Sequence, residues 1–255
     1  MISKIRNILK KSERIRFIII KIKYFLNIGL ERDAKIIKKM AFNTSVDVGA
    51  NNGYFTNLLL GVSKKVISFE PINYLYKLNL KLFKNKNVTF YNVALGNKDT
   101  YGKLHIPKTG DPESSLINKF KNSLVQKVKI TTGDQLLKNK KDIDFIKIDV
   151  EGYEMFTLKG LKKTIYKYLP IFLIEIEKRH NNDYEKVFKF INNLNYKIFY
   201  LDKTNKLRLI ELENISKFIK KNQNIKKNNI FGYINNFWFI NKKSSIFYSK
   251  DSNYF

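Results

Sequence analysis

The chain has 255 residues, 44% of them hydrophobic, which suits one sizeable α/β domain with a short extension. It contains no cysteine, which excludes disulfides, zinc–thiolate sites, cysteine nucleophiles and cysteine-held iron–sulfur clusters. The net charge is +27, with 49 Lys and Arg residues spread along the chain. This charge reflects either a compositional bias toward Lys, Asn, Ile, Phe and Tyr or a specific site for a polyanion.

Residues 1–39 are predicted to form a basic amphipathic helical extension. Its apolar run is interrupted by Arg16, Lys21 and Lys23, so it is too short and too charged to span a bilayer, and no cleavable signal is evident. We therefore expect a cytoplasmic protein. The extension either covers the edge of a sheet or lies peripherally on the anionic inner face of the membrane.

Residues 40–243 are predicted to form a single α/β domain, followed by a tail at 244–255. Apolar strands alternate with helical stretches, which indicates a mostly parallel sheet with helices on both faces. Strands are expected at 45–48, 66–69, 88–94, 125–131, 145–150, 170–175, 196–201 and 237–240, and helices at 73–83, 132–137, 155–168 and 184–194. We expect mostly loop at 96–124, long enough to suggest a lid, and an irregular insert at 213–235.

The most informative motif is Val46-Asp47-Val48-Gly49-Ala50-Asn51-Asn52-Gly53, followed one helix later by Phe69-Glu70-Pro71. A strand, a glycine turn, a helix and a second strand ending in an acid form a unit that binds a nucleoside. The glycines let the backbone approach the ligand, and the acid accepts hydrogen bonds from ribose hydroxyls. A dinucleotide fingerprint needs three glycines, whereas position 51 is Asn. Asp47 would repel a diphosphate but suits a cationic ligand with an amino-acid tail, which describes S-adenosylmethionine.

Four blocks, in this order, resemble the FkbM-type family of S-adenosylmethionine-dependent methyltransferases over roughly residues 40–242. They are Asp47-x-Gly49-Ala50-Asn51-x-Gly53-Tyr54-Phe55-Thr56, Phe69-Glu70-Pro71, Asn92-Val93-Ala94-Leu95 and Ile146-Lys147-Ile148-Asp149-Val150-Glu151-Gly152-Tyr153-Glu154. The resemblance implies a Rossmann-like class I methyltransferase fold, α/β, with seven strands in the order 3-2-1-4-5-7-6. It also implies S-adenosyl-L-methionine as the cofactor and a small molecule or carbohydrate as the acceptor.

On this resemblance, Asp47 would lie near the ammonium group of the cofactor and Glu70 would accept hydrogen bonds from its ribose. The other cofactor contacts are expected from the glycine turn and from the end of the third strand, which would flank the adenine: Gly49, Ala50, Asn51, Gly53, Asn92, Val93 and Ala94. Without a ligand, the glycines would make an ordinary strand-to-helix turn and Glu70 a solvated strand end.

The acceptor is expected at the carboxyl end of the fourth strand. Asp149 could orient the acceptor hydroxyl or take its proton, and Lys147 could pair with Asp149 or hold an anionic acceptor. The alternative is an ion-paired strand end without a catalytic role. Glu151 and Glu175 are expected to bind the substrate, since a carboxylate cluster holds either polyols or a hard divalent cation. We predict no metal site.

His180 follows the fifth strand and is a candidate general base, with an exposed loop histidine as the alternative. Ser115 belongs to Ser114-Ser115-Leu116, where the FkbM-type family tends to have a Ser-Ser-Leu element near the cofactor. It is expected to contact the acceptor.

The leading hypothesis is an S-adenosylmethionine-dependent O-methyltransferase that acts on a hydroxyl of a glycan, a glycan precursor or another small molecule. An RNA methyltransferase is the alternative suggested by charge. Against it, the fourth strand ends in Asp149-Val150-Glu151-Gly152 and not in the N/D-P-P-aromatic run that cradles an exocyclic amine, so nucleic acid is an unexpected partner. A third alternative is a catalytically inactive, methyltransferase-like binding subunit.

Overall fold

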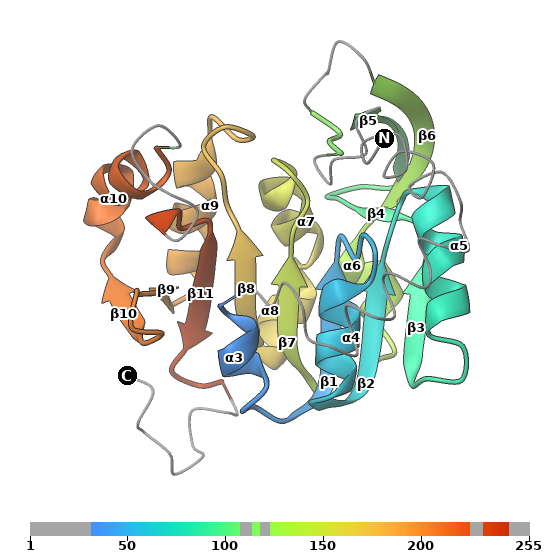
Figure 1. Cartoon of the computed structure of the whole chain (residues 1–255), viewed down its shortest axis with the longest axis horizontal. Coiled ribbons are helices and arrows are strands. Elements are labelled where there is room, and N and C mark those ends of the chain that lie inside the picture. Colours follow the sequence, from blue (N-terminus) through green and yellow to red (C-terminus); the bar gives the residue numbers. More distant parts are fainter. Residues whose placement is uncertain (1–31, 108–113, 118–122, 225–231, 245–255) are drawn as a thin grey trace, which may run out of the picture.

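The computed structural model describes residues 32–107, 114–117, 123–224 and 232–244 (Figure 1). The central feature is a sheet of eight strands in the order β10-β9-β11-β8-β7-β1-β2-β3. The strands are β1 (Phe42–Val48), β2 (Ser63–Phe69), β3 (Val88–Tyr91), β7 (Ile143–Ile148), β8 (Ile171–Glu175), β9 (Tyr196–Leu201), β10 (Leu207–Ile210) and β11 (Asn236–Asn241). From β3 to β8 neighbouring strands are parallel, and β11 runs antiparallel to both β8 and β9.

The predicted class I arrangement is confirmed, but the predicted strand count and order differ in detail. Seven of the strands lie in the order expected of them, including β11 inserted between β8 and β9. The eighth strand, β10, was not predicted. It pairs antiparallel with β9 at the edge of the sheet, where only two of its four residues, Leu207 and Ile210, are buried.

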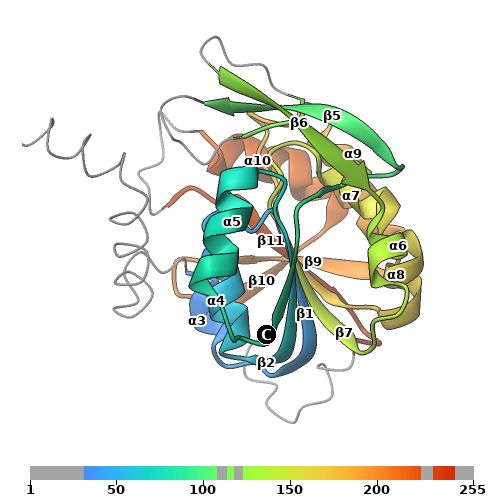
Figure 2. The ribbon, with the colours of Figure 1, turned by 90° about the vertical axis from the view of Figure 1, so that its right-hand side faces the viewer.

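Helices cover both faces of the sheet (Figure 2). The helices are α3 (Ala34–Ile37), α4 (Tyr54–Leu60), α5 (Asn73–Leu82), α6 (Gly133–Leu137), α7 (Glu154–Gly160), α8 (Lys162–Tyr168), α9 (Tyr184–Asn192) and α10 (Ile215–Asn222), with a short 3-10 helix η1 (Leu212–Asn214). Strand side chains alternate between the two faces. In β7, Ile146 and Ile148 pack with α7, α8 and α9, whereas Phe145 packs with α3 and α4.

A second, three-stranded sheet lies over the carboxyl edge of the main one, in the order β4-β6-β5. It consists of β4 (Ala94–Leu95), β5 (Thr100–Pro107) and β6 (Ser123–Thr131). The prediction of mostly loop at 96–124 was therefore wrong for β5, which pairs antiparallel with β6 along its whole length. The two strands pack on α5 through the inward-pointing apolar side chains of Leu104, Ile106 and Val128.

The irregular insert predicted at 213–235 is also partly wrong, since η1 and α10 occupy its first half and α10 buries Ile215 and Ile219 against the main core. Most of the predicted extension at 1–39, and the tail at 244–255 beyond Ser244, lie outside the described residues. The described end of the extension buries Ala34, Ile36 and Ile37 in the core beside α4. In the described part of the chain, no helix combines the length and apolarity that crossing a bilayer requires.

Candidate active site

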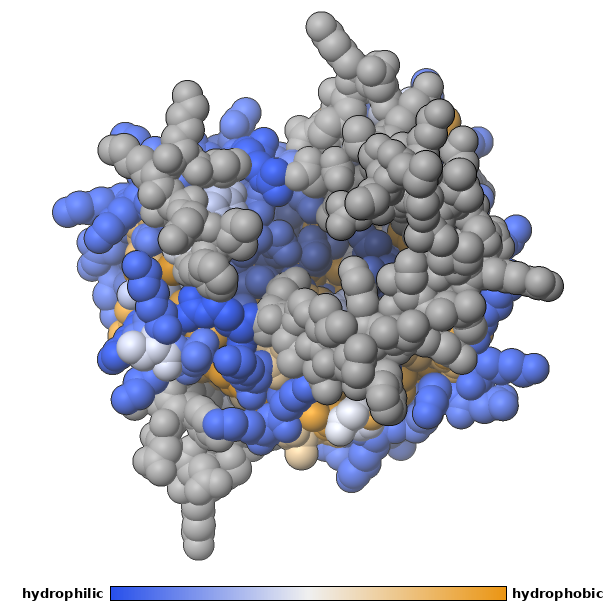
Figure 3. All heavy atoms as spheres, viewed as in Figure 1, coloured by the Kyte–Doolittle hydropathy of each residue, from blue (hydrophilic) through white to orange (hydrophobic). Residues whose placement is uncertain are grey.

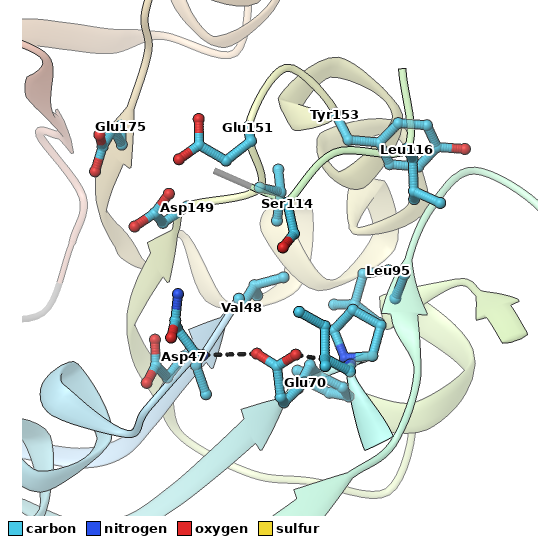
Figure 4. A pocket seen from close by; sticks show the side chains of 18 of the residues that line it. Asp47, Val48, Glu70, Leu95, Ser114, Leu116, Asp149, Glu151, Tyr153 and Glu175 are labelled. Carbon is cyan, nitrogen blue, oxygen red and sulfur yellow. Dashed lines mark hydrogen bonds between the residues drawn. The ribbon is translucent and has the colours of Figure 1, made fainter. Parts of the chain in front are cut away.

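A cavity of about 500 Å³ lies at the carboxyl ends of β1, β2, β7 and β8. The second sheet and the neighbouring segment 114–117 close it from above through Leu104, Ser114 and Leu116. In Figure 4, Glu70 lies at one end of the cavity, and Asp149, Glu151 and Glu175 gather at the other. Figure 3 views the same face as Figure 1, and hydrophilic residues cover most of its described surface. The cavity therefore has the position at which parallel α/β sheets bind ligands and a size typical of small-molecule sites.

The turn after β1 is shaped by close packing against neighbouring protein. Gly49 has φ +86°, and a Cβ atom there would lie 1.8 Å from the carbonyl oxygen of Asp149. Gly53 has φ +84°, and its Cβ would lie 2.6 Å from atoms of Asn79 and Phe83. Both positions therefore require glycine for the fold itself. Gly49, Ala50 and Asn51 line the cavity, whereas Gly53 faces α5.

Glu70 directly follows β2 and is buried, with 3% of its surface exposed. Its Oε2 atom accepts a hydrogen bond from the backbone N–H of Asn51 at 2.6 Å, and Oε1 accepts one from Ile72 at 2.7 Å. Burial raises the pKa of this carboxyl to about 8. A carboxylate has about four acceptor positions, and the described residues use two of them here. Glu70 can therefore accept two further hydrogen bonds from a diol in the cavity.

Asp47 lies on β1 directly beneath the turn and lines the cavity floor. Its Oδ2 atom accepts a hydrogen bond of 2.6 Å from the hydroxyl of Thr56, which is also 2.8 Å from the hydroxyl of Ser68. Burial raises the pKa of Asp47 to about 6, while Thr56 and the ammonium group of Lys147 counteract that rise. Asp47 thus offers a negative charge in a poorly solvated place, which favours a cationic ligand group.

Lys147 is fully buried on β7, opposite Asp47 in the register of the sheet. Its ammonium nitrogen lies 3.8 Å from a carboxylate oxygen of Asp149 and 3.8 Å from one of Glu175, and 4.8 Å from the ring centre of Phe55. Lys147 does not line the cavity. Its position fits the predicted pairing with Asp149 and does not support contact with an anionic acceptor.

Three carboxylates converge at the far end of the cavity. One oxygen each from Asp149, Glu151 and Glu175 lies within 4.8 Å of the others, and all three residues line the cavity. Asn235 donates hydrogen bonds to Glu175 at 2.7 Å and to the neighbouring Glu177 at 2.8 Å. Such a cluster can bind hydroxyl groups as hydrogen-bond donors or hold a divalent cation. The prediction that these acids come together is therefore supported by their placement.

His180 lies behind Glu151 and does not line the cavity. Its Nε2 atom is 3.2 Å from Glu151 and 3.5 Å from Glu177, and only 7% of its side chain is exposed. The alternative of an exposed loop histidine is wrong. As placed, His180 can orient Glu151 but does not reach an acceptor, so its predicted role as a direct base has no support in this geometry.

Of the remaining predicted contact residues, some line the cavity and others lie behind its wall. Val93 and Ala94 line the cavity beside the Glu70 end, whereas Asn92 donates hydrogen bonds to the backbone oxygens of Glu70 and Pro71 at 2.9 and 3.1 Å. Ser115 is fully buried and donates a hydrogen bond of 2.8 Å to the carbonyl oxygen of Glu151. Its neighbour Ser114 is the serine that lines the cavity.

The cavity wall also contains polar and aromatic residues to which sequence reasoning gave no site role, among them Tyr153, Arg179 and Asn235. Tyr153 stacks on Phe156 with ring centres 4.6 Å apart, and it directly follows the Glu151–Gly152 turn, which could have indicated it. Arg179 comes close behind β8 and pairs with Glu177. Asn235 immediately precedes β11, and only the pairing of β11 with β8 brings it here.

The sheet, its covering helices and the cavity at its carboxyl edge define the fold of a class I methyltransferase. A family model described as the Methyltransferase FkbM domain matches residues 47–198, more than half of the chain. The chain therefore belongs to the FkbM family of methyltransferases, whose methyl donor is S-adenosylmethionine. The predicted family, enzyme class and cofactor are confirmed.

Several solved structures are similar at low sequence identity. The FkbM methyltransferase from Methylobacillus flagellatus KT is 15% identical with a TM-score of 0.48, and the match covers 78% of this chain but only 43% of that one. An rRNA methylase from Streptococcus thermophilus (13% identity, coverage 82% and 93%, TM-score 0.46) and an O-methyltransferase from Bacillus cereus in complex with SAH (12%, 81% and 76%, 0.44) are also similar. No curated protein sequence matches. These likenesses leave the acceptor open.

Proposed function

We propose that this methyltransferase transfers the methyl group to a hydroxyl of a carbohydrate, such as a glycan or its precursor, or of another small neutral molecule. The observation that carries this proposal is the cluster of Asp149, Glu151 and Glu175 at the cavity end opposite Glu70. Ionised carboxylates only accept hydrogen bonds, and a polyol offers several hydroxyl donors. The same cluster repels phosphate and carboxylate groups.

S-adenosylmethionine supplies a methyl group already activated on a positively charged sulfur. In the proposed arrangement the ribose hydroxyls donate to Glu70, and the adenine lies beside Val93 and Ala94. Asp47 lies on the floor between the two ends of the cavity, where its buried negative charge would stabilise the positive amino-acid tail. The carboxylate cluster would then face the transferred methyl group.

Asp149 is the proposed partner of the acceptor hydroxyl. Two carboxylates of the cluster, Asp149 and Glu175, pair with Lys147. Asp149 is the more exposed of the two, with 31% of its side chain accessible. As the new O–CH₃ bond forms and the S–CH₃ bond breaks, the hydroxyl proton would pass to this carboxylate. Lys147 lies beside Asp149 and His180 beside Glu151, and neither lines the cavity. They would therefore position these two acids without touching the acceptor.

A methyl-transfer assay on a defined panel tests the acceptor class. Neutral oligosaccharides, sugar-nucleotide precursors and RNA are offered in turn with labelled cofactor. The proposal expects methylated hydroxyls on the neutral sugar portion, and about 100-fold lower activity in Asp149→Asn, since general acid–base groups contribute about 10²–10⁴-fold. The exposed Asp183→Asn serves as the matched control. Methylation of RNA alone would establish the alternative substrate, and cofactor binding without turnover on any acceptor would favour an inactive binding subunit.

The cellular location is part of the same proposal. We infer a cytoplasmic enzyme, since S-adenosylmethionine and sugar precursors are made there, with residues 1–39 able to rest on an anionic membrane. The basic composition of that segment supports this inference. Removing residues 1–31 only, which keeps the core residues Ala34, Ile36 and Ile37, should leave methyl transfer to a soluble acceptor unchanged while reducing recovery with membranes.

A further inference from the structure

The second sheet presents an outward face with an unusual composition. In β5 and β6, Leu104, Ile106, Val128 and Ile130 point inward and are buried. The residues that alternate with them point outward, and we call this set the ribbon face: Tyr101, Lys103, His105, Val125, Lys127 and Lys129. Figure 2 shows β5 and β6 crossing the outside of the molecule at the top of that view.

The lysines of the ribbon face are close neighbours across the two strands. Lys103 lies directly opposite Lys127 in the antiparallel register, and Lys129 lies opposite Tyr101. Like charges directly opposite each other destabilise a strand pair. Neither β5 nor β6 contains an Asp or Glu residue to offset them. These two strands therefore present uncompensated positive charge, which attracts an anionic partner.

Large apolar side chains accompany these lysines. Tyr101 is 64% exposed and Val125 55%, and Ile117 beside this sheet is 46% exposed. The ammonium group of Lys127 lies 4.6 Å from the ring centre of Tyr101. Exposed aromatic and aliphatic side chains mixed with lysine are typical of surfaces that rest at a lipid interface, where the apolar groups enter the acyl boundary and the cations meet the headgroups.

We propose that the ribbon face docks on an anionic lipid surface. A nucleic acid fits this face less well, since single-strand binding needs several stacking platforms and the face offers one exposed aromatic ring, Tyr101, beside the partly buried His105 and the aliphatic Val125. The docking does not depend on which acceptor is methylated. It adds a contact within the folded domain to the one predicted for residues 1–39.

Vesicle binding of the full chain tests the proposal. Each lysine near an anionic membrane contributes about fivefold to binding, so replacing Lys103, Lys127 and Lys129 by Gln should weaken binding to phosphatidylglycerol vesicles about 100-fold. The matched control replaces Lys162, Lys163 and Lys167 of α8 by Gln, which removes the same charge from exposed positions on a different element. This control should bind nearly as the wild type does, and neither should bind pure phosphatidylcholine strongly.

A second measurement follows insertion directly. The chain has one tryptophan, Trp238, which is fully buried, so Tyr101→Trp adds an exposed reporter on the ribbon face. Its emission should shift to shorter wavelength on anionic vesicles and be quenched by brominated acyl chains. Equal vesicle binding by the two lysine triples, or an unshifted reporter on bound protein, would overturn the proposal. If the protein instead binds RNA, loses that binding when the three ribbon-face lysines are replaced, and does not bind vesicles, the ribbon face is a nucleic-acid surface and the proposal is wrong.

Discussion

At the scale of single residues, the proposed cofactor binding depends most on Glu70. Its two oxygens hold the backbone of Asn51 and Ile72 and keep acceptor capacity toward the cavity. Glu70→Gln replaces an anionic acceptor by a neutral one, and hydrogen bonds to charged groups contribute about 1.5–3 kcal/mol. We expect the dissociation constant of S-adenosylhomocysteine, measured by calorimetry, to rise about 10- to 100-fold. Glu213→Gln, at an exposed position, should leave it unchanged.

The affinity should also depend on pH through the same residue. Burial raises the pKa of Glu70 to about 8, so near neutral pH the empty site holds a proton there. Ribose hydroxyls donate to the ionised form, and binding must therefore release that proton. Affinity is expected to rise as pH increases from about 6 to 8 and to level off above the raised pKa, by no more than about tenfold per pH unit. Glu70→Gln should lose this rise, and a wild-type affinity that falls over the interval contradicts the account.

Lys147 matters because it is the cation shared by two carboxylates of the acceptor cluster. Lys147→Met keeps most of the apolar stem of the side chain but removes the ammonium group that pairs with Asp149 and Glu175. Breaking a buried pair costs about 3–5 kcal/mol, and the partial exposure of both acids reduces this to about 2 kcal/mol of unfolding free energy. Urea denaturation measures it, with the half-exposed Lys197→Met as control. Equal stability of the two variants would show that Lys147 is not the counter-charge.

At the scale of elements, the turn between β1 and α4 depends on the contact between Gly49 and the backbone after β7. In Gly49→Ala the new methyl group would overlap the carbonyl oxygen of Asp149, and its backbone has positive φ. We expect a loss of about 3 kcal/mol or more in unfolding free energy, together with weaker cofactor binding. Gly61→Ala is the control, because Gly61 has φ −75° and its nearest neighbour would be 3.3 Å away. A Gly49→Ala variant as stable as that control would mean that the turn is not packed as described.

Periodicity and motif order predicted the strands of the main sheet because these strands are buried runs of apolar residues. β5, β10 and α10 escaped prediction since they lie at edges and bury few side chains. In β5, Leu104 and Ile106 alternate with Lys103 and His105, but Gly102 and the polar surroundings resemble a loop. Edge elements are specified by the partner they pack on, which a single local segment does not contain.

The candidate site was predictable to the level of the strand end but not to the direction of each side chain. Asp47, Glu70 and Asp149 were correctly expected near one edge because parallel strands end together. Ser115 was expected to contact the acceptor, but Ser114 lines the cavity instead, since a β-bridge with His105 holds Ser115 where it donates to the carbonyl oxygen of Glu151. The burial of Lys147 and His180 likewise depends on helices and turns distant in the sequence.

At the scale of the whole molecule, a strongly basic chain encloses an acidic cavity. Burial raises the pKa of Asp47 to about 6, of Glu154 to about 7 and of Glu70 to about 8. In the unfolded chain these groups ionise near pH 4, so between pH 4 and 8 the folded state binds more protons. Unfolding free energy without cofactor should therefore fall as pH rises from about 5 to 8. Urea midpoints at pH 5, 6.5 and 8 measure this, and a steady rise over that range would be inconsistent with these buried acids.

The central claim is that the cavity over the carboxyl edge of the sheet holds the methyl donor with its ribose on Glu70. A crystal structure of the chain grown with saturating S-adenosylhomocysteine at pH 8.5 tests it most directly. The account predicts both ribose hydroxyls about 2.5–3.0 Å from the oxygens of Glu70, the adenine beside Val93 and Ala94, and the sulfur facing Asp149. A ligand bound elsewhere, or a ribose held by another residue while Glu70 keeps only its two backbone contacts, would contradict it.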